Sequence, residues 1–303
     1  MRISNLTFNI FSVMKIKIAA QTDIGKEREQ NEDAFIICPD LSHPDWGKAE
    51  AQIDLGEYGA LLVVADGMGG ANAGEVASGL AVETLKKCFS VPEIADAVVA
   101  EERALAFLQE SIKTADKVIK GQIQERPETM GMGTTVVVCW ILKDKLLIAW
   151  CGDSRCYVFN PKKGLRALTK DHSYVQELVD KGELTEEAAF EHPDSNMITR
   201  GLGDFETETL ADTVAYSIQP HDIFLLCSDG LCGYCRKSAI ERVLNDHYKD
   251  INECCKKLMG LALDAGGYDN ICIALASVCD ESEMDANSAS GLQNFFKRLF
   301  SRK

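Results

Sequence analysis

Very short links join several of the strand-length apolar runs in this chain. Lys143 and Asp144 link the runs Thr135–Leu142 and Leu146–Cys151, and a turn-rich stretch, Asn160–Gly164, ends the next run. Parallel strands need a crossover of about a dozen residues, so neighbours joined this tightly can pair only in the antiparallel sense. The sequence therefore predicts antiparallel sheets as the framework of the fold.

Helical patterns accompany the strands and indicate the fold class. Strand-like runs, apolar throughout or alternating with period two, recur at Ile16–Gln21, Ala34–Cys38, Ala60–Ala65, Thr135–Leu142, Leu146–Cys151, Cys156–Phe159, Asp212–Ser217, Ile223–Cys227 and Ile271–Ser277. Apolar residues recur with helical spacing in Ala73–Phe89, Ile94–Gln122, Lys237–Asn245 and Asn252–Leu263. With 46% hydrophobic residues in 303, the chain can bury a sizeable core. We expect an α+β fold whose helices cover the outer faces of stacked sheets.

The net charge and the length of the apolar runs each exclude one class of function. Lys and Arg number 32 against 47 Asp and Glu, which gives a net charge of −15, whereas nucleic-acid binding needs clustered positive charge. No apolar run approaches the roughly 18 residues that a membrane-spanning helix requires. The sequence therefore predicts neither a nucleic-acid-binding protein nor a transmembrane enzyme.

The 12 cysteines indicate the redox compartment. Most lie in or beside apolar strand-like runs, where a free cysteine behaves as a small hydrophobe. Cys232 and Cys235 form a C-x-x-C pair, which is compatible with a redox pair or half of a zinc site. The adjacent Cys254 and Cys255 lack the spacing of a second half, which argues against zinc. We expect reduced thiols and a cytoplasmic location.

Acidic residues recur at the termini of the strand-like runs, mostly beside glycine. The set comprises Glu32, Asp33, Asp66, Asp153, Asp229 and Asp269. One such corner is usually a turn, but sheets bring strand ends together, and clustered carboxylates repel one another unless cations neutralise them. An oxygen-only ligand set favours Mg²⁺ or Mn²⁺ over Zn²⁺. Two such ions about 3.5–4 Å apart can generate hydroxide near neutral pH.

These corners belong to a series of motifs that together identify a family. The motifs are Gly25–Asp33, Asp66–Gly70, Gly131–Thr135, Cys151–Arg155, Leu168–Ser173, His192–Gly203, Cys227–Leu231 and Gly267–Ile271. In this order they resemble those of the PPM-type phosphatases, the protein phosphatase 2C family of metal-dependent Ser/Thr phosphatases, in a bacterial-like form. The resemblance covers about Lys15 to Cys279. It implies an αββα sandwich of two antiparallel β-sheets flanked by helix pairs.

The resemblance also implies a role for each acidic residue. Asp66 would bridge two metal ions, with the Gly67 carbonyl on one of them, and Asp229 and Asp269 would complete the second side. Asp153 resembles the ligand of a third, weaker ion in bacterial members.

Two further acids and one arginine complete the implied site. Glu32 and Asp33 would hold waters or ligate directly. Arg28 matches the arginine that binds the substrate phosphate, and its planar fork suits two phosphate oxygens at once.

The implied activity is hydrolysis of phosphoserine and phosphothreonine in proteins by a water activated at the two-metal centre, without a covalent intermediate. Its partners would be phosphorylated proteins and a cognate Ser/Thr kinase system. Two alternatives remain open: a non-catalytic regulator and a regulatory switch with one substrate. The first should have lost metal ligands, and all of them are present here.

Two departures from the family pattern affect the mechanism. Met68 stands where many eukaryotic members carry a histidine that is the proposed general acid, so the leaving alcohol must obtain its proton elsewhere. Pro39–Tyr58, which contains Trp46, lengthens the link before the Asp66 motif, and we expect a surface excursion over a hairpin end, with a role in docking a partner as the alternative. His172 is an open candidate for catalysis.

Neighbouring motif residues have simpler interpretations. For His192 a local hydrogen bond is the favoured interpretation. Arg200 is expected to pair with an acidic neighbour rather than with phosphate.

The chain ends define the domain organisation. Residues 1–14 form an N-terminal extension, 15–279 the phosphatase domain with a polar flap at about 173–196, and 280–303 an acidic linker with a basic amphipathic tail. The apolar residues of the tail, from Leu292 to Phe300, fall on one helical face. We expect either a helix folded back on the domain or a weak contact with a membrane or partner.

Overall fold

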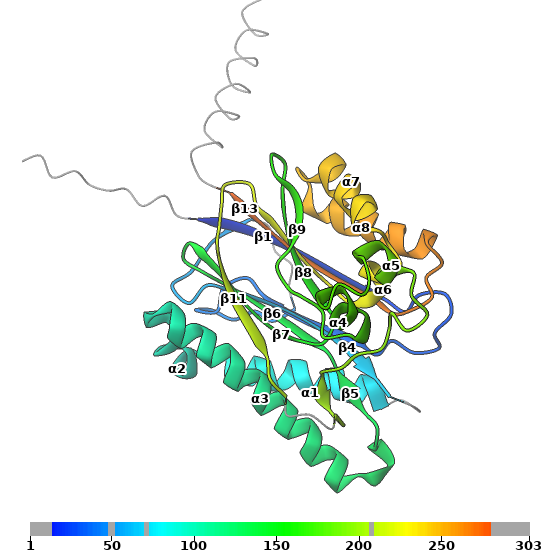
Figure 1. The fold of residues 1–303 in the computed structure, drawn as a ribbon. Coiled ribbons are helices and arrows are strands. Elements are labelled where there is room, and N and C mark those ends of the chain that lie inside the picture. The colour runs from blue at the N-terminus through cyan, green and yellow to red at the C-terminus, as the bar shows by residue number, and fades with distance from the viewer. Residues whose placement is uncertain (1–13, 48–51, 70–72, 206–208, 280–303) are drawn as a thin grey trace, which may run out of the picture.

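The computed structural model describes residues 14–47, 52–69, 73–205 and 209–279. Two antiparallel sheets lie face to face, with helices on their outer sides (Figure 1). The first sheet has the order β3-β1-β13-β12-β8-β9, formed by Ile53–Asp54, Lys15–Asp23, Ile271–Cys279, Ile223–Cys227, Arg155–Asn160 and Gly164–Ala167. The second has the order β10-β5-β4-β6-β7-β11, formed by Leu202–Gly203, Gly133–Thr134, Ala60–Met68, Val136–Leu142, Lys145–Cys151 and Asp212–Ser217, with β2 (Asp33–Cys38) beside β4. This architecture confirms the predicted α+β sandwich.

The helices cover both outer faces of the sandwich. They are α1 (Ala73–Cys88), α2 (Val91–Ile94), α3 (Glu101–Glu125), α4 (Tyr174–Asp180), α5 (Glu186–Phe190), α6 (Asp229–Cys232), α7 (Lys237–His247) and α8 (Ile251–Asp264). Helices α1 and α3 pack on the second sheet, and α7 and α8 pack on the first. No helix in the described ranges is both long and apolar enough to cross a membrane.

The core forms layers that follow from the strand patterns. Side chains such as Ile18, Leu62 and Phe224 fill the space between the sheets. Trp140 and Leu108 belong to the layer beneath α1 and α3. Strand β6 is buried along its whole length, because one face meets the other sheet and the opposite face meets α3 and α1. Its continuous apolar run, rather than an alternating one, is the consequence.

One helix prediction was wrong at its start. The predicted helix Ile94–Gln122 is divided into α2, a 3₁₀ turn at Ala97–Val99 and α3. Pro92 stands in the first turn of α2, where its fixed φ suits a helix start. Ala100 is extended, with φ −145° and ψ 148°, and this interrupts the helix before α3 begins.

The stretch before β4 is not simply a surface excursion, which corrects the expectation for Pro39–Tyr58. Leu41 is fully buried and Trp46 is partly buried against the layer beneath α1 and α3. The Trp140 indole N–H donates to the Tyr58 carbonyl at 2.8 Å. Apolar side chains at Leu41 and Trp46 therefore anchor the stretch to the core.

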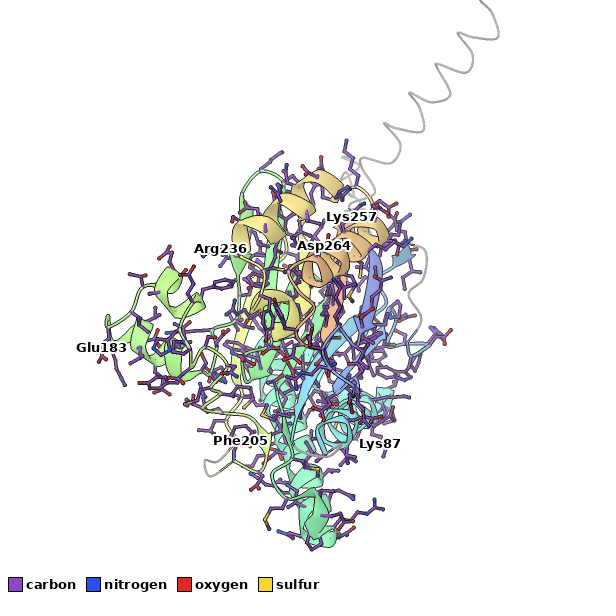
Figure 2. The ribbon with its side chains drawn as sticks, turned by 90° about the vertical axis from the view of Figure 1, so that its right-hand side faces the viewer. Lys87, Glu183, Phe205, Arg236, Lys257 and Asp264 are labelled. Atoms are coloured by element: carbon purple, nitrogen blue, oxygen red, sulfur yellow. The ribbon has the colours of Figure 1, made fainter. Side chains whose placement is uncertain are left out.

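The polar segment predicted as a flap carries α4 and α5. Figure 2 shows it standing clear of the sandwich on one side, around Glu183. The side chains of Ser173 and Thr185 cap the two helices by accepting backbone N–H groups. Arg236, next to α7, pairs with Glu191 at the end of the segment. The expected extension at 1–13 and the tail at 280–303 lie outside the described residues.

Candidate metal centre

Strand ends from both sheets bring the predicted acids to one edge of the sandwich. Asp33 opens β2 and lies directly opposite Asp66 of β4 in the antiparallel register. Asp229 follows β12 as the first residue of α6, and Asp269 precedes β13, the partner of β12. Directly opposed residues in antiparallel strands lie about 4.5–5.5 Å apart, and like charges there repel. The fold thus assembles four acids from four separate segments.

Gly67 and Glu32 lie where β4 meets the N-terminus of α1. A Cβ atom on Gly67 would stand 2.2 Å from the Gly74 carbonyl oxygen and 2.6 Å from that of Glu32, so only glycine fits here. The Gly67 N–H donates to the Glu32 carbonyl at 3.1 Å. The Gly74 N–H donates to the Glu32 carboxylate. Because a helix N-terminus favours negative charge, α1 holds Glu32 at the edge of the cluster.

Ser228 and Asn270, which the sequence interpretation did not single out, hold the acids in place. The Ser228 hydroxyl donates to Asp33 at 2.7 Å and accepts a backbone N–H of β13 at 2.9 Å. Asn270 accepts the Glu32 N–H at 2.8 Å and donates to two carbonyl groups of the loop between β1 and β2. Both residues adjoin a predicted acid in sequence, which is the signal that could have found them.

Asp153 lies in the link from β7 to β8, which crosses between the sheets. Gly152 adopts φ +116° and passes so close to Thr135 that a Cβ would stand 2.5 Å from it. The hydroxyls of Thr135 and Ser154 are 2.7 Å apart, and Thr135 also accepts the Asp66 N–H at 3.1 Å. This network ties the Asp153 corner to the end of β4.

The two histidines and Arg200 have supporting contacts. His172 is buried; its Nδ1 accepts the Gly152 N–H at 3.1 Å, and its Nε2 lies 3.3 Å from Asp212 without hydrogen-bond geometry. His192 accepts the N–H two residues on, and Arg200 pairs with Asp212 at 3.2 Å, as expected. His172 therefore helps to hold the turn that carries Asp153, through its contact with Gly152.

The electrostatics of the cluster follow from burial. Burial raises the pKa of Asp33 to about 8 and that of Asp229 to about 6. The same cause raises the pKa of Asp66 and of Asp153 well above the usual range. The neighbouring carboxylates add to each shift, because anions withdrawn from water repel one another strongly. The folded chain therefore holds its acids in an environment that resists their ionisation.

Arg28 stands at the mouth of this cluster. Its Nη2 donates to Asp269 at 2.7 Å, while 51% of its side chain stays exposed. The hydrogen bond to Asp269 raises the pKa of Arg28, and Asp229 and Glu32 act in the same direction. The guanidinium is therefore held over the acids and remains open to an incoming anion.

The donor set fits a divalent cation. Within the described residues, Oδ1 of Asp33 and Oδ1 of Asp153 are buried without a hydrogen-bond partner, which is costly unless a cation meets them. No group of three or more His, Cys, Asp or Glu side chains in that part of the chain has ligating geometry as it stands, and Asp33 and Asp269 bond to Ser228 and Arg28. A cation would have to replace such contacts, and oxygen-only donors suit Mg²⁺ or Mn²⁺.

The rim of the centre is aromatic and apolar. Tyr234 and Tyr268 are 41% and 54% exposed, with ring centroids 5.6 Å apart. Asp229 and Asp269 contribute to the raised pKa of Tyr234, which places the pair beside the acids. Met68 ends β4 and has no proton to donate. The rim therefore offers surface for a peptide but no acid at the Met68 position.

The chain is similar to known phosphatases over most of its length. Residues 21–271 match the family model of protein phosphatase 2C. The serine/threonine phosphatase stp of Listeria welshimeri is 34% identical over 255 residues, which are 84% of this chain and 93% of that protein. The serine/threonine protein phosphatase PstP of Mycobacterium tuberculosis is 34% identical over 266 residues, which are 88% of this chain and 45% of the longer relative.

Solved structures share the fold. The catalytic domain of PstP in complex with two manganese ions matches with a TM-score of 0.70 and 31% identity, covering 88% of this chain and 100% of that one. Stp1 from Staphylococcus aureus matches with a TM-score of 0.73 and 35% identity, covering 86% and 94%. The sequence match and the fold match agree, and the chain belongs to the protein phosphatase 2C family.

Proposed function

We propose that this chain releases phosphate from phosphoserine and phosphothreonine by direct hydrolysis at the acidic edge described above. It is a protein serine/threonine phosphatase, and its substrates are phosphorylated proteins. The observation that carries the proposal is an exposed arginine held over buried acids, two of which have unpaired oxygens. Arg28 would bind the phosphate, and the acids would hold the cations that the reaction needs.

The acids divide into two groups in this proposal. Asp66, Asp229 and Asp269, with the Gly67 carbonyl, would hold two Mn²⁺ or Mg²⁺ ions, and Asp153 a third. When bound, such ions supply Lewis acidity that lowers the pKa of water and offsets charge on phosphoryl oxygens. The structure of PstP in complex with two manganese ions supports the two-ion part of this assignment by family likeness.

The remaining residues position the acids and the phosphate. Glu32 and Asp33 complete the ring, held by Asn270 and by Ser228 respectively. Arg28 would exchange its Asp269 contact for two phosphate oxygens.

A covalent cysteine intermediate is disfavoured by the local chemistry. Cys272 is fully buried beside the cluster, and burial raises its pKa well above the usual range, with Asp33 and Asp66 adding to the shift. A thiol held in its protonated form is a poor nucleophile. Water is therefore the attacking group in this proposal. The leaving alcohol takes its proton from a group other than Met68.

The cellular setting is also a proposal. We place the enzyme in the cytoplasm, because its described cysteines are free thiols. There it would act against a Ser/Thr kinase that phosphorylates the same proteins. We further propose that the basic tail 291–303 makes weak contacts with a membrane or partner. A regulator without catalysis would not need the retained acids, and a switch with a single substrate would fail on unrelated phosphopeptides.

Replacing Asp66 with asparagine tests the proposal. Asp66→Asn should lower the Mn²⁺-dependent release of phosphate from a phosphopeptide by about a hundredfold or more, because it removes a shared ligand. Circular dichroism should show that the fold is intact. The matched control is Asp222→Asn, which alters a buried aspartate at the far end of the sheet. Near-wild-type turnover in Asp66→Asn would exclude the two-metal site proposed here.

A further inference from the structure

A cavity lies at the open edge of the sandwich, away from the acids. It has a volume of about 610 Å³ and lies between the β8–β9 hairpin and β11, with Val158, Asn160, Lys163, Arg166, Tyr216 and Gln219 among its lining residues. Strands β9 and β11 end the two sheet orders, so each presents a free edge here. The residues that line the cavity lie at the ends of β8 and β11 farthest from the metal centre. At 3.3 Å per residue, the length of such a strand puts the cavity about 17 Å from the acids.

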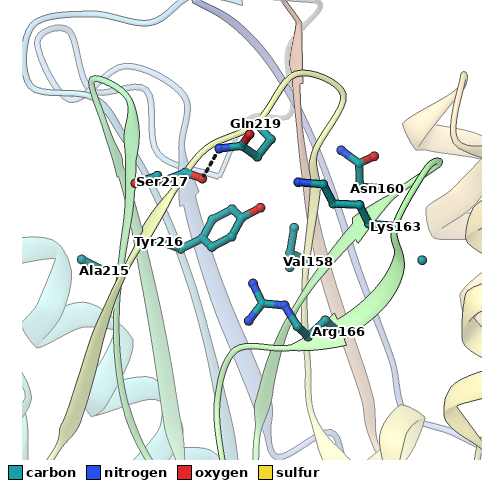
Figure 3. A pocket seen from close by; sticks show the side chains of 9 residues that line it. Val158, Asn160, Lys163, Arg166, Ala215, Tyr216, Ser217 and Gln219 are labelled. Atoms are coloured by element: carbon teal, nitrogen blue, oxygen red, sulfur yellow. Dashed lines mark hydrogen bonds between the residues drawn. The ribbon is translucent and has the colours of Figure 1, made fainter.

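The cavity is basic in a chain of net charge −15. Lys163 and Arg166 both reach into it, opposite the Tyr216 hydroxyl (Figure 3). Arg166 lies 5.5 Å from the centre of the Tyr216 ring. Within the described part of the chain, neither cation forms a salt bridge. Both charges are therefore available to an anion.

The nearby carboxylates are already satisfied by other donors. Asp222 is fully buried and accepts hydrogen bonds from the Tyr216 hydroxyl, the Asn160 amide and the Gln219 N–H, each at 2.8 Å. On the β9 side, the Glu241 carboxylate accepts the backbone N–H of Leu165 at 3.2 Å. Neither carboxylate is paired with Lys163, so the cavity retains its positive charge.

The described chain ends beside this cavity. The Val278 N–H donates to the Asp222 carbonyl at 3.1 Å, and the Asp222 side chain accepts hydrogen bonds from three of the lining residues. Two strand spacings, about 10 Å, separate β13 from β8, a span that about three extended residues can cover. The residues that follow are Asp280, Glu281, Ser282, Glu283, Met284 and Asp285.

We propose that the cavity is a carboxylate-binding groove and that its occupant is the acidic segment 280–285 of the same chain. These residues lie outside the described structure, and the proposal rests on their sequence and on where β13 ends. In an extended segment, Glu281, Glu283 and Asp285 share one face, because side chains alternate with period two. That face meets Lys163 and Arg166.

Carbodiimide cross-linking of the full-length protein tests the contact. The reagent activates a carboxylate, the touching lysine amine attacks it, and an amide forms as the reagent leaves as its urea, with a net loss of one water from the protein. Lys162 is the matched control, because it is exposed and adjacent but does not line the cavity. Mass spectrometry should find segment 280–285 joined to Lys163 several-fold more often than to Lys162.

A charge reversal and a labelling experiment complete the test. Arg166→Glu should lower the Lys163 yield about fivefold, and 1 M salt should lower it too, since charges are then screened within about 3 Å. Hydrolysis of p-nitrophenyl phosphate should not change in Arg166→Glu, which confirms an intact fold. Equal yields at Lys162 and Lys163, or a yield unaffected by Arg166→Glu, would overturn the proposal. Links between ¹⁵N-labelled and unlabelled chains in a mixture would overturn the same-chain occupant.

Discussion

Replacing Asp33 with asparagine should stabilise the metal-free protein at neutral pH. Asp33 is buried opposite Asp66, and one of its oxygens has no hydrogen-bond partner among the described residues. Asparagine has the same shape, can still accept the Ser228 hydroxyl, and presents an N–H₂ group to the opposing carboxylate. At pH 7 the unfolded Asp33 is ionised, whereas the folded chain without metal must protonate it or bury its charge, and the substitution removes this cost.

The size of the effect follows from the pKa of Asp33. Burial and its neighbours raise this pKa from 3.8 to about 8 in the folded chain. A raised folded pKa stabilises the protein fully below the unfolded value, and this contribution is lost as pH rises toward 8. At 1.36 kcal/mol per pKa unit, the loss by pH 7 is up to about 4 kcal/mol. We expect the free energy of unfolding of Asp33→Asn to be about 2–4 kcal/mol higher than that of the wild type at pH 7. At pH 4 the two free energies should be nearly equal.

Urea unfolding after chelation measures this difference at pH 4, 5.5 and 7. The control is Asp222→Asn, in which the new amide would face donors from Tyr216, Asn160 and Gln219, so it should lose about 1–3 kcal/mol. Adding Mn²⁺ should favour the wild type, because a cation that binds the folded acids stabilises them. If the chelated Asp33→Asn protein is less stable than the chelated wild type at pH 7, burial of the Asp33 carboxyl is not costly in the metal-free fold.

Three further predictions concern the site and the tail. Arg28→Lys keeps the charge but loses the fork, so kcat/KM for phosphopeptides should fall about tenfold or more while Mn²⁺ affinity by calorimetry stays unchanged; equal kinetics would remove Arg28 from phosphate binding. Asp153→Ala should bind two ions by calorimetry yet hydrolyse slowly, and loss of all binding would place Asp153 in the central pair. Deleting 291–303 should reduce cosedimentation with anionic vesicles without altering peptide turnover; no sedimentation of the full chain at low salt would exclude the membrane contact.

Much of the fold could be predicted because its determinants are local. The antiparallel pairing of β6 and β7 follows from the two-residue link at Lys143 and Asp144, which permits nothing else. The apolar spacing of α8 lies within its own sequence. The break before α3 was missed because Ala100 is extended although alanine itself favours a helix, so its residue type gives no sign of the break.

The site was predicted only in outline, since its supporting contacts join distant segments. Asn270 bonds to Glu32, 238 residues away in sequence, and Ser228 bonds to Asp33, 195 residues away. An asparagine and a serine next to an acid resemble ordinary turn residues until the sheets are stacked.

The types of element, the order of the motifs and the identity of the acids could be read from the chain alone, because side-chain periodicity and residue chemistry are properties of the chain. The tertiary structure decided how the acids interact. It set Asp33 opposite Asp66, withdrew both from water, and placed Arg28 on Asp269 at the open side. The carboxyl groups become buried and close to one another only when strands from both sheets meet. Their burial and mutual repulsion raise their pKa values and favour the binding of a cation.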